Sequence, residues 1–168
     1  ALLQTLTLAD LASATFPFGR MQVLDVGPAR VMVQRVSYVG ELGYELFVPV
    51  EQAVALYDAV VAAGAAFGLR HAGILAQDSL RLEKGFRHWG HDIASHDTAL
   101  EAGLGFACAF DKPGGFIGRE ALLVQRQAGL ARRLTLLTVE EGRPLLLGEE
   151  PVYRDGRPAG AVTSGAMA

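Results

Sequence analysis

The chain is poor in cysteine, because Cys108 is the only one in 168 residues. No disulfide can therefore form within the chain, and we expect a reduced, cytoplasmic location. Cys108 lies inside the apolar run 105–110, which favours a buried, inert thiol over a reactive nucleophile. The sequence gives no support to a disulfide scaffold or to thiol chemistry.

An excess of charge of either sign is also lacking. The chain has 15 Lys and Arg against 18 Asp and Glu, for a net charge of −3. This balance leaves no basic surface of the kind that nucleic acids or anionic membranes attract. No uninterrupted apolar run reaches the roughly 18 residues that a membrane span needs. We therefore expect neither a nucleic-acid partner nor a membrane partner.

Side chains that bind metals are sparse. His88 and His91 are three residues apart, with Asp92 and His96 nearby, so a set of three zinc ligands is one interpretation. The Trp-Gly pair between the first two histidines weakens it, because no regular helix is indicated there to direct the side chains to one point. We expect no metal site.

Glycine and proline divide the first half of the chain into short elements. The valine-rich segment 30–38 and the segment 44–48 read as two antiparallel strands, with Gly40 and Gly43 at the reversal. A further strand at 22–26 precedes them. The spacing of apolar residues over 51–63 predicts an amphipathic helix, and a second helix is expected around 75–86.

The second half alternates short apolar runs with turns. We expect strands at 104–110, 134–139 and 150–153, a helix at 119–127, and a hairpin turn at 154–157. The loop 114–119 precedes a helix but lacks the lysine and hydroxyl of a phosphate-binding loop, so a turn is the better interpretation. We place one domain at residues 1–133 and the beginning of an all-β domain at 134–168.

The strand at 44–48 has two different faces. One face is apolar and consists of Leu42, Tyr44, Leu46 and Val48. The opposite face consists of Gly43, Glu45 and Phe47. A carboxylate beside an aromatic ring suits a flat heterocycle with two adjacent N–H donors, because a carboxylate can accept both. The alternative is that Glu45 is a solvated side chain on a half-exposed strand.

Two stretches carry a family resemblance: VGELGYELF at 39–47, and DSLRLEKG at 78–85 followed by HWGHD at 88–92. Their order and spacing resemble the folate-binding family built on the glycine-cleavage T-protein, the aminomethyltransferases. The second stretch is most similar to the flavoenzyme branch, the dimethylglycine and sarcosine dehydrogenases and oxidases. With the pattern of elements, the resemblance implies an α+β fold, in which a ferredoxin-like or split βαβ folate-binding subdomain precedes the start of a small β-barrel.

The resemblance also implies which residues bind the cofactor. In this family the second glutamate of the hairpin motif binds the pteridine of tetrahydrofolate, and that position is Glu45. Glu41 is the first glutamate, in the turn, and Tyr44 adjoins Glu45. The family commonly has an arginine that contacts folate directly before the second stretch, where this chain has Gln77. An amide still forms hydrogen bonds but lacks the charge and the fork of the guanidinium.

The activity that the resemblance implies is transfer of an aminomethyl or methylene carbon to tetrahydrofolate. In the flavoenzyme branch a separate upstream FAD domain oxidises a small methylated amine such as dimethylglycine or sarcosine. The alternatives are a stand-alone glycine-cleavage aminomethyltransferase and a non-catalytic folate-binding protein of the same fold.

No catalytic residue is assigned, because the family's catalytic aspartate precedes the hairpin by more residues than this chain has there. We expect an incomplete piece of a longer parent, inactive by itself. Exposed strand edges in such a piece favour a homodimer.

Overall fold

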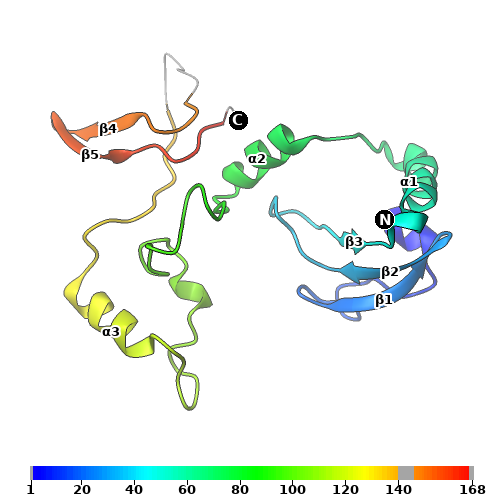
Figure 1. The fold of residues 1–168 in the computed structure, drawn as a ribbon, viewed down its shortest axis with the longest axis horizontal. Coiled ribbons are helices and arrows are strands. Elements are labelled where there is room, and N and C mark those ends of the chain that lie inside the picture. The colour runs from blue at the N-terminus through cyan, green and yellow to red at the C-terminus, as the bar shows by residue number, and fades with distance from the viewer. Residues whose placement is uncertain (1, 140–145, 167–168) are drawn as a thin grey trace. The chain divides into compact units, whose positions relative to one another are not determined.

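The computed structural model describes residues 2–139 and 146–166, and the chain divides into two compact units, Ala1–Arg81 and Leu82–Ala168 (Figure 1). Strands and helices alternate with long irregular segments, and the expected α+β class is confirmed. The first unit contains η1 (Leu2–Leu6), β1 (Met21–Val26), β2 (Ala29–Gln34), β3 (Glu45–Phe47), α1 (Val50–Gly64) and η2 (Ala65–Phe67). Helix α2 (Ile74–Glu83) runs across the boundary between the units.

The first unit is built on an antiparallel sheet in the order β1-β2-β3 (Figure 1). β1 and β2 join through a tight turn at Gly27, which has φ 52° and whose N–H donates to the Leu6 carbonyl at 2.7 Å. The predicted antiparallel pairing of the segments 30–38 and 44–48 is confirmed, although β2 ends earlier, at Gln34. The chain then forms an irregular loop, in which Gly43 lies so near the Val36 carbonyl that an added Cβ would be 3.0 Å from it.

One face of this sheet carries the core of the first unit. Alternation places every second residue of a strand on the same side. The buried set combines these inward residues with others from the N-terminal segment and α1: Leu11, Phe16, Leu24, Val26, Ala29, Val31, Val33 and Leu56. Burial of this apolar surface stabilises the sheet and fixes α1 against it. The opposite face of the sheet is accessible, since its side chains Met21, Val23 and Phe47 are 45–51% exposed.

α1 and η2 together form a helical segment, Val50–Phe67, of 18 residues with mean hydropathy 1.3, which by length and composition could cross a membrane. A core helix can have the same length and composition, and the statement that no uninterrupted apolar run reaches this length still holds. Counting uninterrupted runs missed the segment because Glu51 and Asp58 interrupt it. Leu56 of the same helix is 3% exposed and packs in the core, as in a helix that covers a sheet.

The second unit contains η3 (Gly105–Ala107), α3 (Arg119–Ala128), β4 (Pro151–Arg154) and β5 (Arg157–Ala161). The predicted helix at 119–127 and the hairpin turn at 154–157 are confirmed, and Asp155 and Gly156 both have positive φ, as such turns require. The predicted strand at 104–110 is wrong. Ala107 and Cys108 donate to carbonyls three residues back, which makes a 3-10 turn. The predicted strand at 134–139 is also wrong, since these residues adopt no regular structure.

Polar contacts tie the second unit together. The Arg87 guanidinium donates to three backbone carbonyls, those of Gly85, Ala102 and Gly103, at 2.8–3.2 Å. Arg132 lies 2.9 Å from the Asp97 carboxylate and 3.3 Å from that of Glu101. These contacts join segments distant in sequence, and Ile93 and Ala102 are the buried hydrophobic residues among those of this unit that the structure describes.

Candidate functional site

The face of the sheet opposite the core presents a regular grid of side chains. Three cross-strand rows follow from the register: Met21, Gln34 and Glu45; then Val23, Met32 and Phe47; then Asp25 and Arg30. Residues opposite one another on antiparallel strands lie on the same face. We call this surface the open face. It combines a polar row, an apolar row and an ion pair between Asp25 and Arg30 at 3.5 Å.

Glu45 lies at the edge of the open face, on β3, and its side chain is exposed. No hydrogen bond or ion pair of its carboxylate exists among the residues that the structure describes. Phe47, two residues further along the same strand, is 45% exposed and points to the same side. The structure therefore places an unpaired carboxylate beside an aromatic ring on an accessible surface.

Tyr44 lies on the other side of the strand. Its ring centroid is 6.1 Å from that of the buried Phe16, and its hydroxyl donates to the Leu11 carbonyl at 3.0 Å. The side chain is partly buried against the core. Tyr44 thus anchors β3 and sets the direction in which Glu45 points.

Glu41 lies in the loop that precedes β3, where it is exposed. It lines a concavity of about 260 Å³, together with Phe18, Arg35, Val36, Ser37, Leu42 and Gly43. Arg35 in this concavity donates to the Phe16 carbonyl at 2.6 Å and to the Ser13 hydroxyl at 3.0 Å. Glu41 and Glu45 therefore belong to one hairpin but to different local surroundings.

Gln77 lies on α2, where it is exposed, and no hydrogen bond between described residues joins it to the hairpin of Glu45. In the next turn of α2, Arg81 is fully buried and its Nε donates to the Asp78 carboxylate at 2.7 Å. A buried guanidinium needs such a partner. The three-residue spacing of Asp78 and Arg81 thus marks a structural ion pair.

The histidine segment after α2 is organised around Asp92. Its carboxylate accepts the N–H of His88 at 2.8 Å and the hydroxyls of Thr163 and Ser164 at 2.7 and 2.6 Å. The rings of His88 and His91 lie edge to face, with centroids 5.7 Å apart. In the described ranges 2–139 and 146–166, no group of three or more possible ligands gathers around a metal position.

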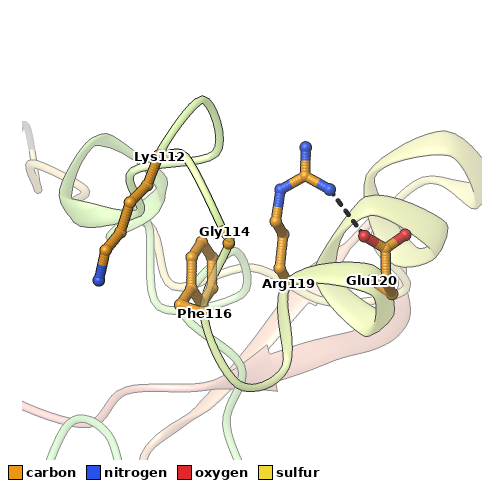
Figure 2. A pocket seen from close by; sticks show the side chains of 6 residues that line it. Lys112, Gly114, Phe116, Arg119 and Glu120 are labelled. Atoms are coloured by element: carbon orange, nitrogen blue, oxygen red, sulfur yellow. Dashed lines mark hydrogen bonds and ion pairs between the residues drawn. The ribbon is translucent and has the colours of Figure 1, made fainter.

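A concavity of about 480 Å³ lies in the second unit, formed by the loop before α3 and the first residues of that helix (Figure 2). Figure 2 shows Phe116 between Lys112 and Arg119, with the Arg119 guanidinium turned toward Glu120. Arg119 donates to the Glu120 carboxylate at 2.7 Å and to the Phe110 carbonyl at 2.8 Å. The Arg119 guanidinium thus binds groups of its own loop and helix, in agreement with the interpretation of this loop as a turn.

Sequence reasoning missed Gln34 and Met32 as residues of the site. Both lie on β2, directly opposite Glu45 and Phe47 respectively. The alternation of buried and less buried residues along β2 places them on the open face. Alternation along the strand could have found them. Ala29, Val31 and Val33 point into the core, so the residues between and after them point to the open face.

Comparison with known proteins gives two family matches. The model of the GCVT N-terminal domain matches residues 1–112, and that of the glycine cleavage T-protein C-terminal barrel domain matches residues 132–168. The chain is 47% identical over 162 residues to human mitochondrial sarcosine dehydrogenase. The aligned region covers 96% of this chain and 18% of that protein. It is 43% identical over 139 residues to an aminomethyltransferase of Halothermothrix orenii, covering 83% of this chain and 38% of that protein.

A solved structure shares the fold. The crystal structure of the glycine cleavage system aminomethyltransferase T from Bartonella henselae matches with a TM-score of 0.65 and 28% identity, covering 93% of this chain and 44% of that one. The chain therefore spans only part of the length of each of these relatives. With most of its residues matched by the two family models, the chain belongs to the glycine cleavage T-protein family.

Proposed function

We propose that the open face binds the pterin ring of tetrahydrofolate and that the chain is the one-carbon-transfer module of a flavin-dependent dehydrogenase for a small methylated amine. The observation that carries this proposal is the unpaired, exposed carboxylate of Glu45 beside Phe47, in a member of the T-protein family. A carboxylate can accept the two neighbouring N–H groups on the edge of a pterin in a charge-assisted pair of hydrogen bonds. Such bonds are about twice as strong as neutral ones.

The residues of the chain have separate tasks in this proposal. Glu45 holds the donor edge of the ring, and Phe47 with Met32 offers apolar surface to its face. Tyr44 fixes the strand from the core side through its hydrogen bond to Leu11. When bound, tetrahydrofolate supplies the nitrogen atoms that take up the one-carbon unit. Glu41 and Gln77 are proposed as outer contacts of the folate, and no residue of the chain is assigned the proton transfer.

The 47% identity to sarcosine dehydrogenase favours the flavoenzyme branch, with FAD in a separate domain upstream. The second candidate is a stand-alone aminomethyltransferase, which the 43% identity to that relative supports. The two differ in where the one-carbon unit originates, and they share the same folate face. We also propose the division at residues 1–133 and 134–168 as the boundary between the folate-binding part and the barrel part.

Location and partners follow the same reasoning. The sarcosine dehydrogenase named above is mitochondrial, so the comparisons give no support to the cytoplasm in particular. A mitochondrial location also agrees with a single, unpaired cysteine. We propose folate and a small methylated amine as the ligands, with no nucleic acid and no membrane as partner. The exposed edges of the two-stranded sheet β4-β5 are the proposed contact of a homodimer.

Glu45→Gln tests the proposal. The amide accepts one of the two bonds and turns its own N–H toward a donor, so we expect tetrahydrofolate affinity in the full-length protein to fall by about 1.5–3 kcal/mol, roughly ten- to a hundredfold. Titration calorimetry measures it. Glu41→Gln is the matched control, since it makes the same change in the neighbouring loop, and it should have a much smaller effect.

Oxidation of the methylated amine provides a second measurement, because it occurs at the flavin and not on the open face. The Glu45→Gln protein should still oxidise its amine and should release formaldehyde in place of the folate-bound carbon. Equal folate affinity for the wild type and Glu45→Gln would show that Glu45 is only a solvated surface residue.

A further inference from the structure

Gln34 and Glu45 form a directly opposed pair on the open face. The register of β2 and β3 places their Cα atoms opposite each other. Side chains in such a pair have Cβ atoms about 4.5–5.5 Å apart, within reach of one small ligand edge. Neither side chain forms a hydrogen bond with any part of the chain that the structure describes. The face therefore presents a free carboxylate next to a free carboxamide.

The two groups differ in what they can offer. An ionised carboxylate only accepts hydrogen bonds, whereas a carboxamide has two N–H donors as well as an acceptor oxygen. The other residue of this row, Met21, has no N–H or O–H group in its side chain. Arg30, the cation of the open face, is paired with Asp25. Among the described residues of this face, Gln34 is thus the uncharged donor nearest to Glu45.

The edge of a pterin carries three polar groups in order: the 2-amino group, the N3–H and the 4-oxo oxygen. The first two donate and the third accepts. Glu45 satisfies the two donors, and the remaining oxygen then needs a donor beside the carboxylate. Gln34 lies on the side of Glu45 toward β1, and one of the two orientations of a ring over Met32 and Phe47 directs that oxygen to this side.

We propose that Gln34 is a ligand-binding residue that donates a hydrogen bond to the 4-oxo group of the bound pterin. This inference rests on the proposed function, because it requires Glu45 to hold the same ring. Gln34 and Glu45 together then recognise a donor–donor–acceptor edge. A 2,4-diamino pteridine has an amino group at position 4 and no proton on N3, so its edge reads donor–acceptor–donor. It mismatches Glu45 at N3, whereas the amide of Gln34 can turn its oxygen toward the 4-amino group.

The test compares folic acid with aminopterin, its 4-amino analogue, on the wild type and on Gln34→Glu in the full-length protein. Glutamate at position 34 can accept from an amino group but cannot donate to an oxo group. We expect the ratio of the two dissociation constants to move toward aminopterin by about 3- to 10-fold, the effect of one neutral hydrogen bond. The ratio cancels only the effect of the added charge that both ligands share. Gln34→Leu adds no charge, removes the same donor and should weaken folic acid binding by a similar factor.

Gln22→Glu is the matched control. It makes the same substitution on the same sheet, but Gln22 pairs with the buried Val33 and so lies on the opposite face from Gln34. Its ratio should equal that of the wild type. An unchanged ratio in Gln34→Glu, with folate binding still lost in Glu45→Gln, overturns the role of Gln34 alone. Unchanged folate binding in Glu45→Gln overturns the proposed function and this inference together.

Discussion

Each of the two units of the chain is stabilised by a different kind of interaction. The first has eight buried apolar residues on one side of a three-stranded sheet. In the described part of the second unit, Ile93 and Ala102 are the buried hydrophobic residues, and hydrogen bonds and ion pairs join segments distant in sequence. Hydrophobic packing is non-directional, whereas hydrogen bonds fail when one partner turns away. The open face therefore lies on the unit whose shape depends least on individual polar contacts.

This contrast has a consequence for ligand binding. A recognition surface with two polar groups needs a backbone that holds them in register. The antiparallel pairing of β2 with β3 and the anchoring of Tyr44 provide this on the first unit. The second unit instead joins distant segments through groups such as Asp92, whose carboxylate contacts Thr163 and Ser164.

The largest expected effect is the loss of core packing in the first unit. Phe16 is 2% exposed and its ring lies against that of Tyr44. Phe16→Ala should lower the free energy of unfolding of this unit by about 3–5 kcal/mol, because it removes buried surface and leaves a cavity. Phe18→Ala is the control on the same segment, since Phe18 is 75% exposed and its removal should change stability by no more than about 0.5 kcal/mol.

Circular dichroism during denaturation follows the secondary structure of both units, whereas the single tryptophan, Trp89, reports on the second unit alone. Phe16→Ala should shift the first signal more than the fluorescence of Trp89. Equal shifts in both signals would mean that the two units unfold as one, and the comparison would then fail.

The elements that could be predicted from the sequence are those fixed by local pattern. The strand pair around Gly40 and Gly43 and the helix at 119–127 follow from alternation, glycine placement and helical spacing. The strand at 104–110 could not be distinguished from a turn, because a short apolar run has no decisive period. Its carbonyls are instead satisfied within a 3-10 turn.

The candidate site was predictable only in part. Glu45 and Phe47 share one strand, so their common face follows from local alternation. The pairing of Gln34 with Glu45 depends on how ten intervening residues loop back, and a shift of one residue would turn Gln34 into the core. Tertiary packing sets that register, through Val31 and Val33 on the inner face.

A smaller effect is expected for Arg87 in the second unit. Its guanidinium donates to the carbonyls of Gly85, Ala102 and Gly103. Arg87→Met keeps most of the aliphatic length but leaves these carbonyls without that donor, so we expect a loss of about 2 kcal/mol in the stability of this unit. Trp89 fluorescence during urea denaturation measures it. Arg133→Met removes the same charge from an exposed position and should be close to neutral.

The contrary result for Arg87 would be informative. If Arg87→Met and Arg133→Met have the same stability, the carbonyls find water instead, and the second unit is held by something other than its buried polar contacts. The two units would then differ less than the structure indicates.

The smallest expected effect is a pH dependence of the second unit through Glu101. Its carboxylate accepts the N–H of Thr98 at 2.9 Å and lies 3.3 Å from the Arg132 guanidinium. The hydrogen bond from the Thr98 backbone is the main cause that lowers the pKa of Glu101 below its ordinary value of 4.5. Desolvation opposes it, and the Thr98 hydroxyl and Arg132 lower the pKa further.

A carboxyl group whose pKa is lowered on folding stabilises the native state when it is ionised. Its contribution is present in full above the unfolded pKa and is lost as pH falls through the folded pKa, so the loss occurs below about pH 4.5. The urea midpoint read from Trp89 should therefore fall between pH 5 and pH 3 by more in the wild type than in Glu101→Gln, which cannot titrate there. Glu120→Gln makes the same change of charge on α3, and its curve should follow that of the wild type. If Glu101→Gln also follows the wild type through this interval, other carboxylates account for the acid sensitivity, and Glu101 contributes to the second unit only through its geometry.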